Sequence, residues 1–223
     1  MTAVVRTGGE GSGAGGVSVL IIPLNLEGVE RRPLKNSGVQ ASGSTLLTFD
    51  EVKVPKKYLI GKENRGFNVV MTNFNMERLV LAVSSLRMSR NCIHDAYQYA
   101  CKRHTFGKPL IAQPIIQAKF SDMGRKVEAL QAWLEMLGHQ LRAFRDNKKV
   151  ADMELGGKIA LLKVESGFVL EQCVREAQQV LGGAGYLKSS SGPGARIEQI
   201  SRDVRVMVVG VSSSVCVRFR RKS

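Results

Sequence analysis

Glu77 stands inside an almost wholly apolar stretch, residues 67–86, which reads FNVVMTNFNMERLVLAVSSL. On a helix it would share its stripe with four residues that carry no positive charge, namely Val70, Phe74, Leu81 and Ser84. A carboxylate that is held away from water either pairs with a charge from another helix or takes up a proton more readily. The first state would make Glu77 structural, and the second suits a general base.

The other residues of this stretch extend the apolar surface around the predicted helix. Large side chains cover the remaining directions: Val69, Met71, Met76, Leu79 and Val83. A helix that is apolar on every side is normally buried. We therefore expect the helix around Glu77 to be buried.

Two further segments contain residue types that hold phosphate groups. The first, CKRHTFGKPL at residues 101–110, combines three cations with a threonine and a glycine: Lys102, Arg103, Thr105, Gly107 and Lys108. The second, QQVLGGAGYLK at residues 178–188, contains Gly182, Gly183 and Gly185. Cations also favour a helix C-terminus, and glycine is its usual stop signal. Taken singly, each segment fits a plain helix end as well as a binding site.

The composition narrows the class of protein. Of the 223 residues, 43% are hydrophobic, which is enough for a packed core. No apolar run approaches the roughly 18 to 20 residues of a membrane span, and no cationic and apolar leader follows Met1. A soluble, intracellular protein is expected, with mitochondrion, peroxisome and cytoplasm all open. The four cysteines form no CxxC pair and the three histidines are scattered, which predicts free thiols and no metal site.

The net charge of +14 follows from 33 basic and 19 acidic residues. Such an excess suits nucleic acid, anionic lipid or a phosphorylated ligand. The basic residues of the middle segment, residues 61–211, are mixed with Asp and Glu along helical patterns, which is typical of a solvated face. No stripe of interleaved aromatic and basic residues supports binding to nucleic acid.

The predicted elements fall into two classes along the chain. Short alternating runs broken by Pro, Gly, Asn and Ser fill residues 1–60, which indicates antiparallel β structure. Helical patterns then follow at about 64–104, 111–146, 150–181 and 195–209. Long helices with brief connections pack as an antiparallel bundle. The sequence therefore predicts an α+β chain, in which the end of a β domain (1–60) precedes a four-helix bundle (61–211) and an irregular basic tail (212–223).

The motifs as a set resemble a known family. FDEVKVP, GKENRGF, NMERLVLA, RHTFGKPL, QVLGGAGY and RIEQISRDV occur in the order and spacing of the second half of an acyl-coenzyme A dehydrogenase. The resemblance implies a homotetrameric or dimeric FAD flavoprotein that acts on acyl-CoA. It also implies a C-terminal helical domain and a chain that begins inside the middle β domain. Its electrons would pass to a carrier flavoprotein or to oxygen.

The resemblance also implies where the catalytic base lies. In most members a carboxylate that follows the RD helix removes the α proton of the acyl thioester, and that position falls on Val211, which cannot accept a proton. The isovaleryl-type and long-chain members carry the base in an ERL segment of the first bundle helix. Glu77, in MERL, matches this second arrangement.

The resemblance assigns binding roles to eight further residues. Six would contact the pyrophosphate and adenine end of the FAD of a neighbouring subunit: Arg103, Thr105, Phe106, Gln179, Gly182 and Gly183. Asn75 and Arg78 would contact the coenzyme A part of the substrate.

The sequence departs from the family pattern in two places. Pro114 stands where glutamine usually contacts FAD, and residues 212–223 alternate Val215, Val217 and Phe219 where the family has a last helix. We expect this tail to be irregular because its serines and β-branched residues are mediocre helix formers. A basic nucleic-acid-binding relative and a non-catalytic fragment are the alternative readings.

Overall fold

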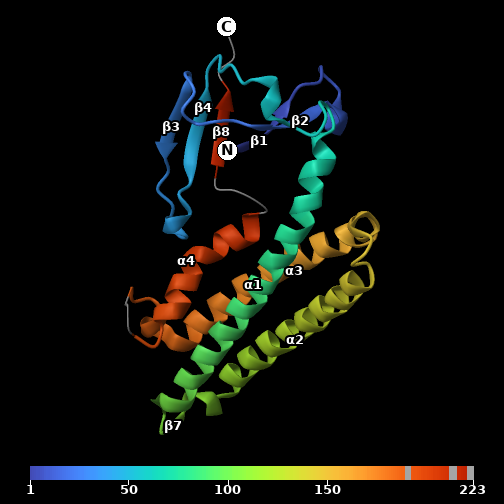
Figure 1. Cartoon of the computed structure of the whole chain (residues 1–223). Helices are drawn as coiled ribbons and strands as arrows, with labels where there is room; N and C mark the ends of the chain where they lie inside the picture. Colours follow the sequence, from blue (N-terminus) through green and yellow to red (C-terminus); the bar gives the residue numbers. More distant parts are fainter. Residues whose placement is uncertain (189–191, 211–214, 220–223) are drawn as a thin grey trace. The chain divides into compact units, whose positions relative to one another are not determined.

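The computed structural model describes residues 1–188, 192–210 and 215–219, and they form two compact units (Figure 1). The first unit comprises residues 1–36, 40–76 and 212–223, and the second comprises residues 37–39 and 77–211. The predicted fold class, a partial β domain followed by a helical bundle, is confirmed. The predicted domain boundary at residue 61 stays a prediction. The two compact units divide at Glu77, which lies within a helix.

The first unit contains two three-stranded sheets. The strands β1 (Thr2–Arg6), β2 (Val17–Ile21) and β5 (Leu59–Ile60) pair antiparallel in that order. In the second sheet β3 (Val29–Pro33) and β4 (Thr45–Phe49) are antiparallel, and β8 (Val215–Phe219) pairs with β4 in parallel. A small core of Ala3, Ile22, Leu47 and Phe49 holds this unit together.

The prediction of an irregular tail was wrong for Val215–Phe219, which form strand β8. The segment is not helical, in keeping with its low helix propensity, but it pairs with the edge of β4. An unpaired strand edge presents a row of backbone donors and acceptors, and an alternating β-branched segment fits it well. Residues 212–214 and 220–223 lie outside the described residues.

The second unit is the helical bundle. Its helices are α1 (Gly66–Lys102, which begins in the first unit), α2 (Pro114–Ala143), α3 (Lys148–Leu181) and α4 (Ala195–Val209). The short strands β6 (His104–Thr105) and β7 (Lys108–Pro109) form a hairpin after α1. Five 3-10 turns complete the described elements: Gly13–Gly16, Gln40–Ser42, Lys56–Tyr58, Leu110–Ala112 and Gly182–Gly185.

Local signals in the sequence set the helix ends. Pro114 occupies the first turn of α2, where its missing N–H costs nothing. Asn147 caps α3 by accepting a hydrogen bond from the backbone N–H of Val150 at 3.3 Å. Gly182 ends α3 with a positive φ of 57°, a conformation that favours glycine.

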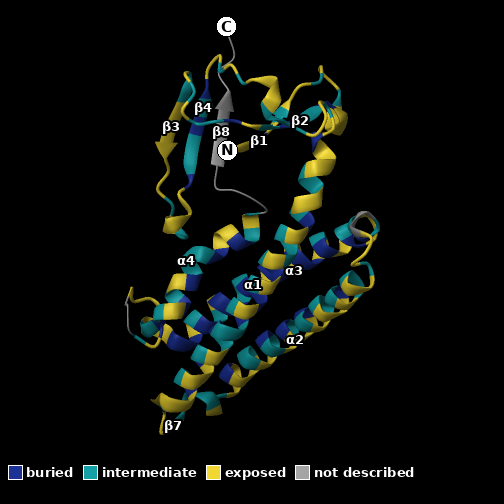
Figure 2. Ribbon diagram, viewed as in Figure 1, coloured by how far each residue is buried: buried dark blue, intermediate teal, exposed yellow. Residues whose placement is uncertain are grey.

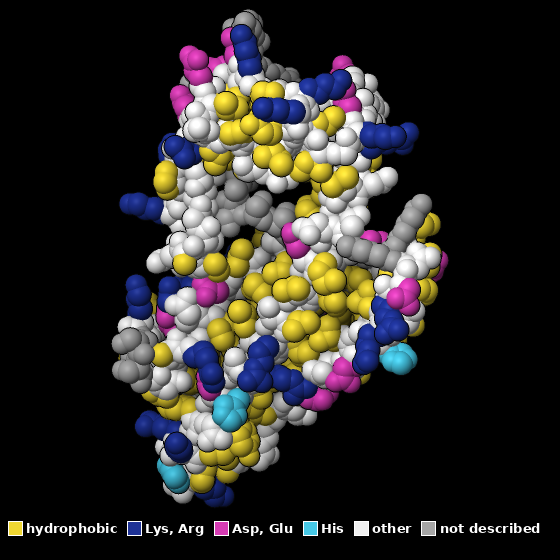
Figure 3. Space-filling view, in the orientation of Figure 1, with side chains coloured by type: hydrophobic (Ala, Val, Ile, Leu, Met, Phe, Trp, Pro, Cys, Tyr) yellow, Lys and Arg dark blue, Asp and Glu magenta, His cyan; other side chains and the backbone are white. Residues whose placement is uncertain are grey.

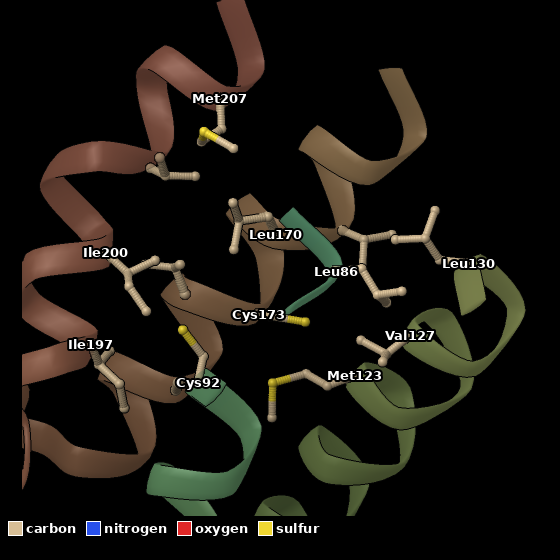
Figure 4. Packing of buried hydrophobic residues seen from close by; sticks show 14 of the residues in the cluster. Leu86, Cys92, Met123, Val127, Leu130, Leu170, Cys173, Ile197, Ile200 and Met207 are labelled. Atoms are coloured by element: carbon tan, nitrogen blue, oxygen red, sulfur yellow. The ribbon is translucent and has the colours of Figure 1, made fainter. Parts of the chain in front are cut away.

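One apolar core joins all four helices (Figure 4). Met123 and Val127 of α2 face Cys173 of α3, and Leu170 of α3 lies on the side of α4. Ile197, Ile200 and Met207 enter the core from α4. Burial raises the pKa of the Cys92 thiol to about 12 and that of Cys173 to about 11. Both are free thiols, as predicted, and both behave as small apolar residues here. None of the described helices is long and apolar enough to cross a membrane.

Adjacent leucines of α3 test this packing. Leu162 is fully buried in the core, whereas Leu161 is 62% exposed. We expect Leu162→Ala to lower the free energy of unfolding by about 2 to 5 kcal/mol, because it leaves a cavity. Leu161→Ala should change it by less than about 0.5 kcal/mol. Urea unfolding of both variants at low protein concentration measures the difference, and equal losses would contradict the orientation of α3.

Candidate functional site

The residues predicted for substrate and catalysis lie within one turn of α1. Asn75 is buried, and Glu77 and Arg78 are half-buried. Asn75 and Arg78 are three residues apart and so share a face of the helix, whereas Glu77 lies on a different face. The three residues are therefore close in the chain, but Glu77 projects from a different face of α1 than Asn75 and Arg78.

The expectation that this helix is buried was wrong for its first half. Val69, Met76 and Val83 are 40%, 55% and 47% exposed, while Met71 and Leu79 are half-buried. The reason is that the packed core of the bundle takes its fully buried α1 residues from Ala82 onward. Figure 2 shows the beginning of α1 as exposed and intermediate, with buried positions further along. Apolar side chains also gather in a broad patch over the helical unit in Figure 3.

Lys163 of α3 is a buried cation that the sequence reasoning missed. Its side chain is 5% exposed, and its Nζ donates a hydrogen bond of 2.7 Å to the backbone oxygen of Val208. That oxygen belongs to the last turn of α4, where carbonyl groups lack helical partners. Lys163 therefore caps α4 from the neighbouring helix.

Arg78 adds a second positive charge beside this cap. Burial lowers the pKa of Lys163, and the charge of Arg78 lowers it further. The start of the bundle part of α1, the middle of α3 and the end of α4 thus meet around two cations. A sequence signal existed, since Lys163 stands among apolar residues in IALLKVESG just as Glu77 does in its own stretch.

The hairpin after α1 presents two of the predicted cofactor residues. Phe106 and Gly107 form its turn with φ values of 52° and 74°, and such turns normally hold Asn and Gly. Phe106 is 97% exposed although its conformation is unfavourable for a bulky side chain. The Oγ1 of Thr105 is buried and has no hydrogen-bond partner among the described residues. Strain and an orphaned hydroxyl are features of a binding site.

Backbone hydrogen bonds fix this hairpin to the end of α1. The N–H of Arg103 donates to the oxygen of Tyr99 at 2.9 Å, and the N–H of Leu110 donates to the oxygen of Arg103 at 2.7 Å. The Arg103 side chain itself is exposed. These backbone bonds therefore fix the start and the end of the hairpin, while the cationic side chain of Arg103 remains exposed to solvent.

The glycine segment divides into exposed and packed members. Gly182 and Gly183 are exposed with no atom within 4 Å of an added Cβ, and Gln179 is exposed one turn earlier. Gly185, in contrast, is buried, and its Cβ would lie 3.0 Å from the oxygen of Gln178. Gly185 is thus needed for packing, whereas Gly182 and Gly183 leave backbone open to a ligand.

The hairpin and the glycine segment lie at the same end of the bundle. Successive helices run in opposite directions, so α1 and α3 both end there (Figure 1). A two-pronged ion pair between Arg196 at the start of α4 and Asp95 of α1, with Nε and Oδ2 2.7 Å apart, ties this end together. The hydrogen bonds to Asp95 raise the pKa of Arg196. Glu77 precedes Arg103 by 26 residues, or about 39 Å of helix, so the two groups form separate sites.

Comparison with known proteins identifies the family. The family model "Acyl-CoA dehydrogenase, C-terminal domain" matches residues 64–211. "Acyl-CoA dehydrogenase AFT10-1" of Alternaria alternata is 40% identical over 211 residues, which cover 95% of this chain and 48% of that protein. "Acyl-CoA dehydrogenase apdG" of Emericella nidulans is 41% identical over 214 residues, covering 91% and 48%.

A solved structure supports the same assignment. The structure of a probable acyl CoA dehydrogenase from Mycobacterium abscessus matches with a TM-score of 0.80 and 32% identity, over 96% of this chain and 53% of that one. The chain therefore belongs to the acyl-CoA dehydrogenase family and contains its C-terminal domain, as the motifs predicted. It spans about half the length of the curated relatives it matches.

Phe106 yields a prediction about stability. Because Asn tolerates a positive φ better than Phe, we expect Phe106→Asn to raise the free energy of unfolding by up to about 1 kcal/mol. Tyr186→Asn is the matched control, since Tyr186 is an 89% exposed aromatic residue with an ordinary φ of −98°. Thermal unfolding compares the two. A gain of the same size at Tyr186 would show that strain at Phe106 is not the cause.

Lys163 yields a prediction about pH. Lys163→Met removes a charge-assisted hydrogen bond, and we expect it to lower the free energy of unfolding by about 1 to 2 kcal/mol at pH 7. The pKa of Lys163 is lower in the folded chain, so above that pKa the unfolded chain binds more protons and the wild type gains stability as pH rises. The advantage of wild type over Lys163→Met should therefore widen from pH 7 to pH 10.

Urea unfolding at several pH values measures this advantage. The thiols Cys92 and Cys173 are present in both proteins, so their titration cancels in the difference. Lys158→Met is the control, because Lys158 is an exposed lysine of the same helix. A difference that stays constant or narrows with pH would contradict the buried position of the ammonium group.

Proposed function

We propose that this chain supplies the catalytic base, part of the coenzyme A contacts and a cofactor-binding end of an FAD-dependent acyl-CoA dehydrogenase. The observation that carries the proposal is the position of Glu77 within a chain of this family. Its MERL segment matches the ERL segment in which the isovaleryl-type and long-chain members hold their base, and the alternative position is Val211. Val211 lies outside the described residues.

In the proposed reaction the Glu77 carboxylate removes the α proton of the acyl thioester. FAD, when bound, would supply the acceptor for the hydride of the β carbon, and a double bond would then form between the α and β carbons. The half-buried position of Glu77 limits its contact with water, which suits proton abstraction from a weak carbon acid. Met76 and Val80 are apolar and more than half exposed near Glu77, and they offer a surface for an acyl chain.

Arg78 and Asn75 are proposed to contact the coenzyme A part of the substrate. The guanidinium group of Arg78 can form two parallel hydrogen bonds to a phosphate. Lys163 lies close enough for its pKa to respond to Arg78. An anionic group bound by Arg78 would also offset the repulsion between these two cations.

The other end of the bundle fits the pyrophosphate and adenine end of FAD. Arg103 offers an exposed cation, Thr105 a hydroxyl without a partner in the described chain, and Phe106 an exposed ring. Gly182 and Gly183 leave open space where a Cβ would stand. The cation suits a ligand with negative charge, and the exposed ring suits a flat ring system.

We further propose that the active protein is a homo-oligomer, with a dimer or tetramer as the expected forms. The two groups of residues are separated by about 39 Å of helix, which exceeds the size of a compact ligand pocket. The base and the glycine end can then serve cofactors held by different subunits. We propose a carrier flavoprotein as the partner that would accept the electrons.

Glu77→Gln tests the assignment of the base. In a hybrid that places the N-terminal half of the Alternaria alternata relative before residues 1–223, we expect this variant to lose α-proton exchange by about 10²- to 10⁴-fold. Glutamine keeps the shape of the side chain but cannot accept the proton. Deuterium exchange from solvent into a bound acyl thioester measures the step, and flavin absorbance shows that the cofactor is still held.

Two further variants sharpen this experiment. Glu154→Gln neutralises an exposed glutamate of α3 and should leave exchange unchanged. Glu77→Gln combined with Val211→Glu moves the carboxylate to the position used by most members, and a partial recovery would support the proposed roles. Wild-type exchange in Glu77→Gln would refute the assignment.

A further inference from the structure

The outer face of α3 carries a regular apolar seam. We define the α3 seam as Gly157, Leu161, Val164 and Phe168, which recur at intervals of four, three and four residues. This is the spacing of the contact positions in a two-helix coiled coil. Leu161, Val164 and Phe168 are 62%, 52% and 58% exposed. The seam is therefore apolar surface that the bundle leaves uncovered.

The seam is not a misplaced part of the bundle core. Leu162, Ser166 and Leu170 of the same helix are buried, so α3 already presents a separate face to α2 and α4. Single exposed apolar residues are common on protein surfaces, but a run at coiled-coil spacing marks an interaction surface. Gly157 also weakens an exposed helix by roughly 0.5 to 1 kcal/mol relative to alanine, so its presence calls for a reason.

We propose that the α3 seam pairs with the α3 seam of a second copy of this chain, antiparallel and about a twofold axis. This inference specifies the surface of the homo-oligomer proposed above and rests on that proposal. An antiparallel register that places Leu161 opposite Val164 of the second copy also places Phe168 opposite Gly157. Both pairs are centred on the same point of the helix, between Leu162 and Lys163.

Gly157 provides the space that this register needs. No atom of the chain lies within 4 Å of a Cβ added at Gly157. A phenyl ring of the second copy can therefore approach the backbone of α3 there, and the twofold axis repeats the contact at the other end of the seam. The glycine that weakens the helix thus becomes the socket for Phe168.

Charges beside the seam favour the same arrangement. Lys158 and Glu165 are exposed, and neither forms an ion pair with a described residue. In the proposed register Lys158 lies within two residues, or about 3 Å along the helix, of Glu165 of the second copy. The twofold axis repeats the attraction, so each dimer would contain two contacts between Lys158 of one copy and Glu165 of the other. Parallel packing would instead set Lys158 at the level of Lys158 of the second copy, and this repulsion between like charges opposes the parallel arrangement.

Gly157→Gln separates association from folding. We expect the wild-type chain to form a reversible dimer with a dissociation constant between about 1 μM and 1 mM, since the seam is short. Sedimentation equilibrium measures this constant. Gly157→Gln should weaken dimerisation at least tenfold while the midpoint of thermal unfolding at low concentration stays equal or rises, because glutamine is the better helix former. Gly138→Gln in α2, which also has no atom within 4 Å of its added Cβ, is the matched control and should leave dimerisation unchanged.

Exchange of the two charges tests the register. Lys158→Glu and Glu165→Lys should each weaken self-association, because each creates two like-charge contacts. An equimolar mixture of these variants should recover it, and so should the double variant, whose net charge equals that of the wild type. A monomeric wild type across the concentration range would show that another partner or segment covers the seam. A dimer that ignores all of these variants would place the interface on a different face.

Neither of these two negative results bears on Glu77. Proton exchange by the hybrid protein reports the catalytic proposal, whereas sedimentation reports only the association of α3. The two proposals therefore fail separately.

Discussion

The continuous helix α1 is the constraint on which the rest of the arrangement depends. It runs for 37 residues, from Gly66 to Lys102, without a proline, and thereby carries Glu77 near its beginning and the β6–β7 hairpin directly after its end. The rise of an α-helix converts this separation into about 39 Å. Because α3 runs in the same direction as α1, its terminal glycines lie at the end of the bundle that carries the hairpin, and not at the end that carries Glu77. The geometry of helices alone thus sorts the predicted residues into two sites.

A buried polar contact inside the bundle helps to position the site around Glu77 and Arg78. Lys163 is buried and donates to the last turn of α4, so the cap on α4 comes from a different helix. The two helices pack closely at the same place, since a Cβ added at Gly167 of α3 would lie in van der Waals contact, 3.4 Å from the Cα of Val208. A buried cation is costly unless its hydrogen bonds are made. The hydrogen bond from Lys163 to Val208 forms only when α3 and α4 pack in this register. The packing of α3 against α4 therefore also places the charge of Lys163 near Arg78.

Much of the fold could be predicted because its signals are local. Helical periodicity predicted helices at about 64–104, 111–146, 150–181 and 195–209, close to their observed ends. What failed were statements that depend on partners distant in sequence. Strand β8 forms against the edge of β4, which lies some 170 residues earlier, and no local propensity reveals that pairing. The exposure of Met76 and Val83 likewise depends on which elements of the chain pack against α1.

The candidate site shows the same division between local and distant information. Glu77 was found because a charge interrupts an apolar run, and the hairpin and glycine residues were found through motif spacing. Lys163 interrupts an apolar run too, but IALLKVESG does not show which side of α3 faces inward. Leu161 and Leu162 are neighbours with opposite exposure, and only packing distinguishes them. The same rotation of α3 that turns Lys163 toward α4 turns Leu161 and Val164 outward, so the buried cap and the exposed seam are consequences of one helix orientation.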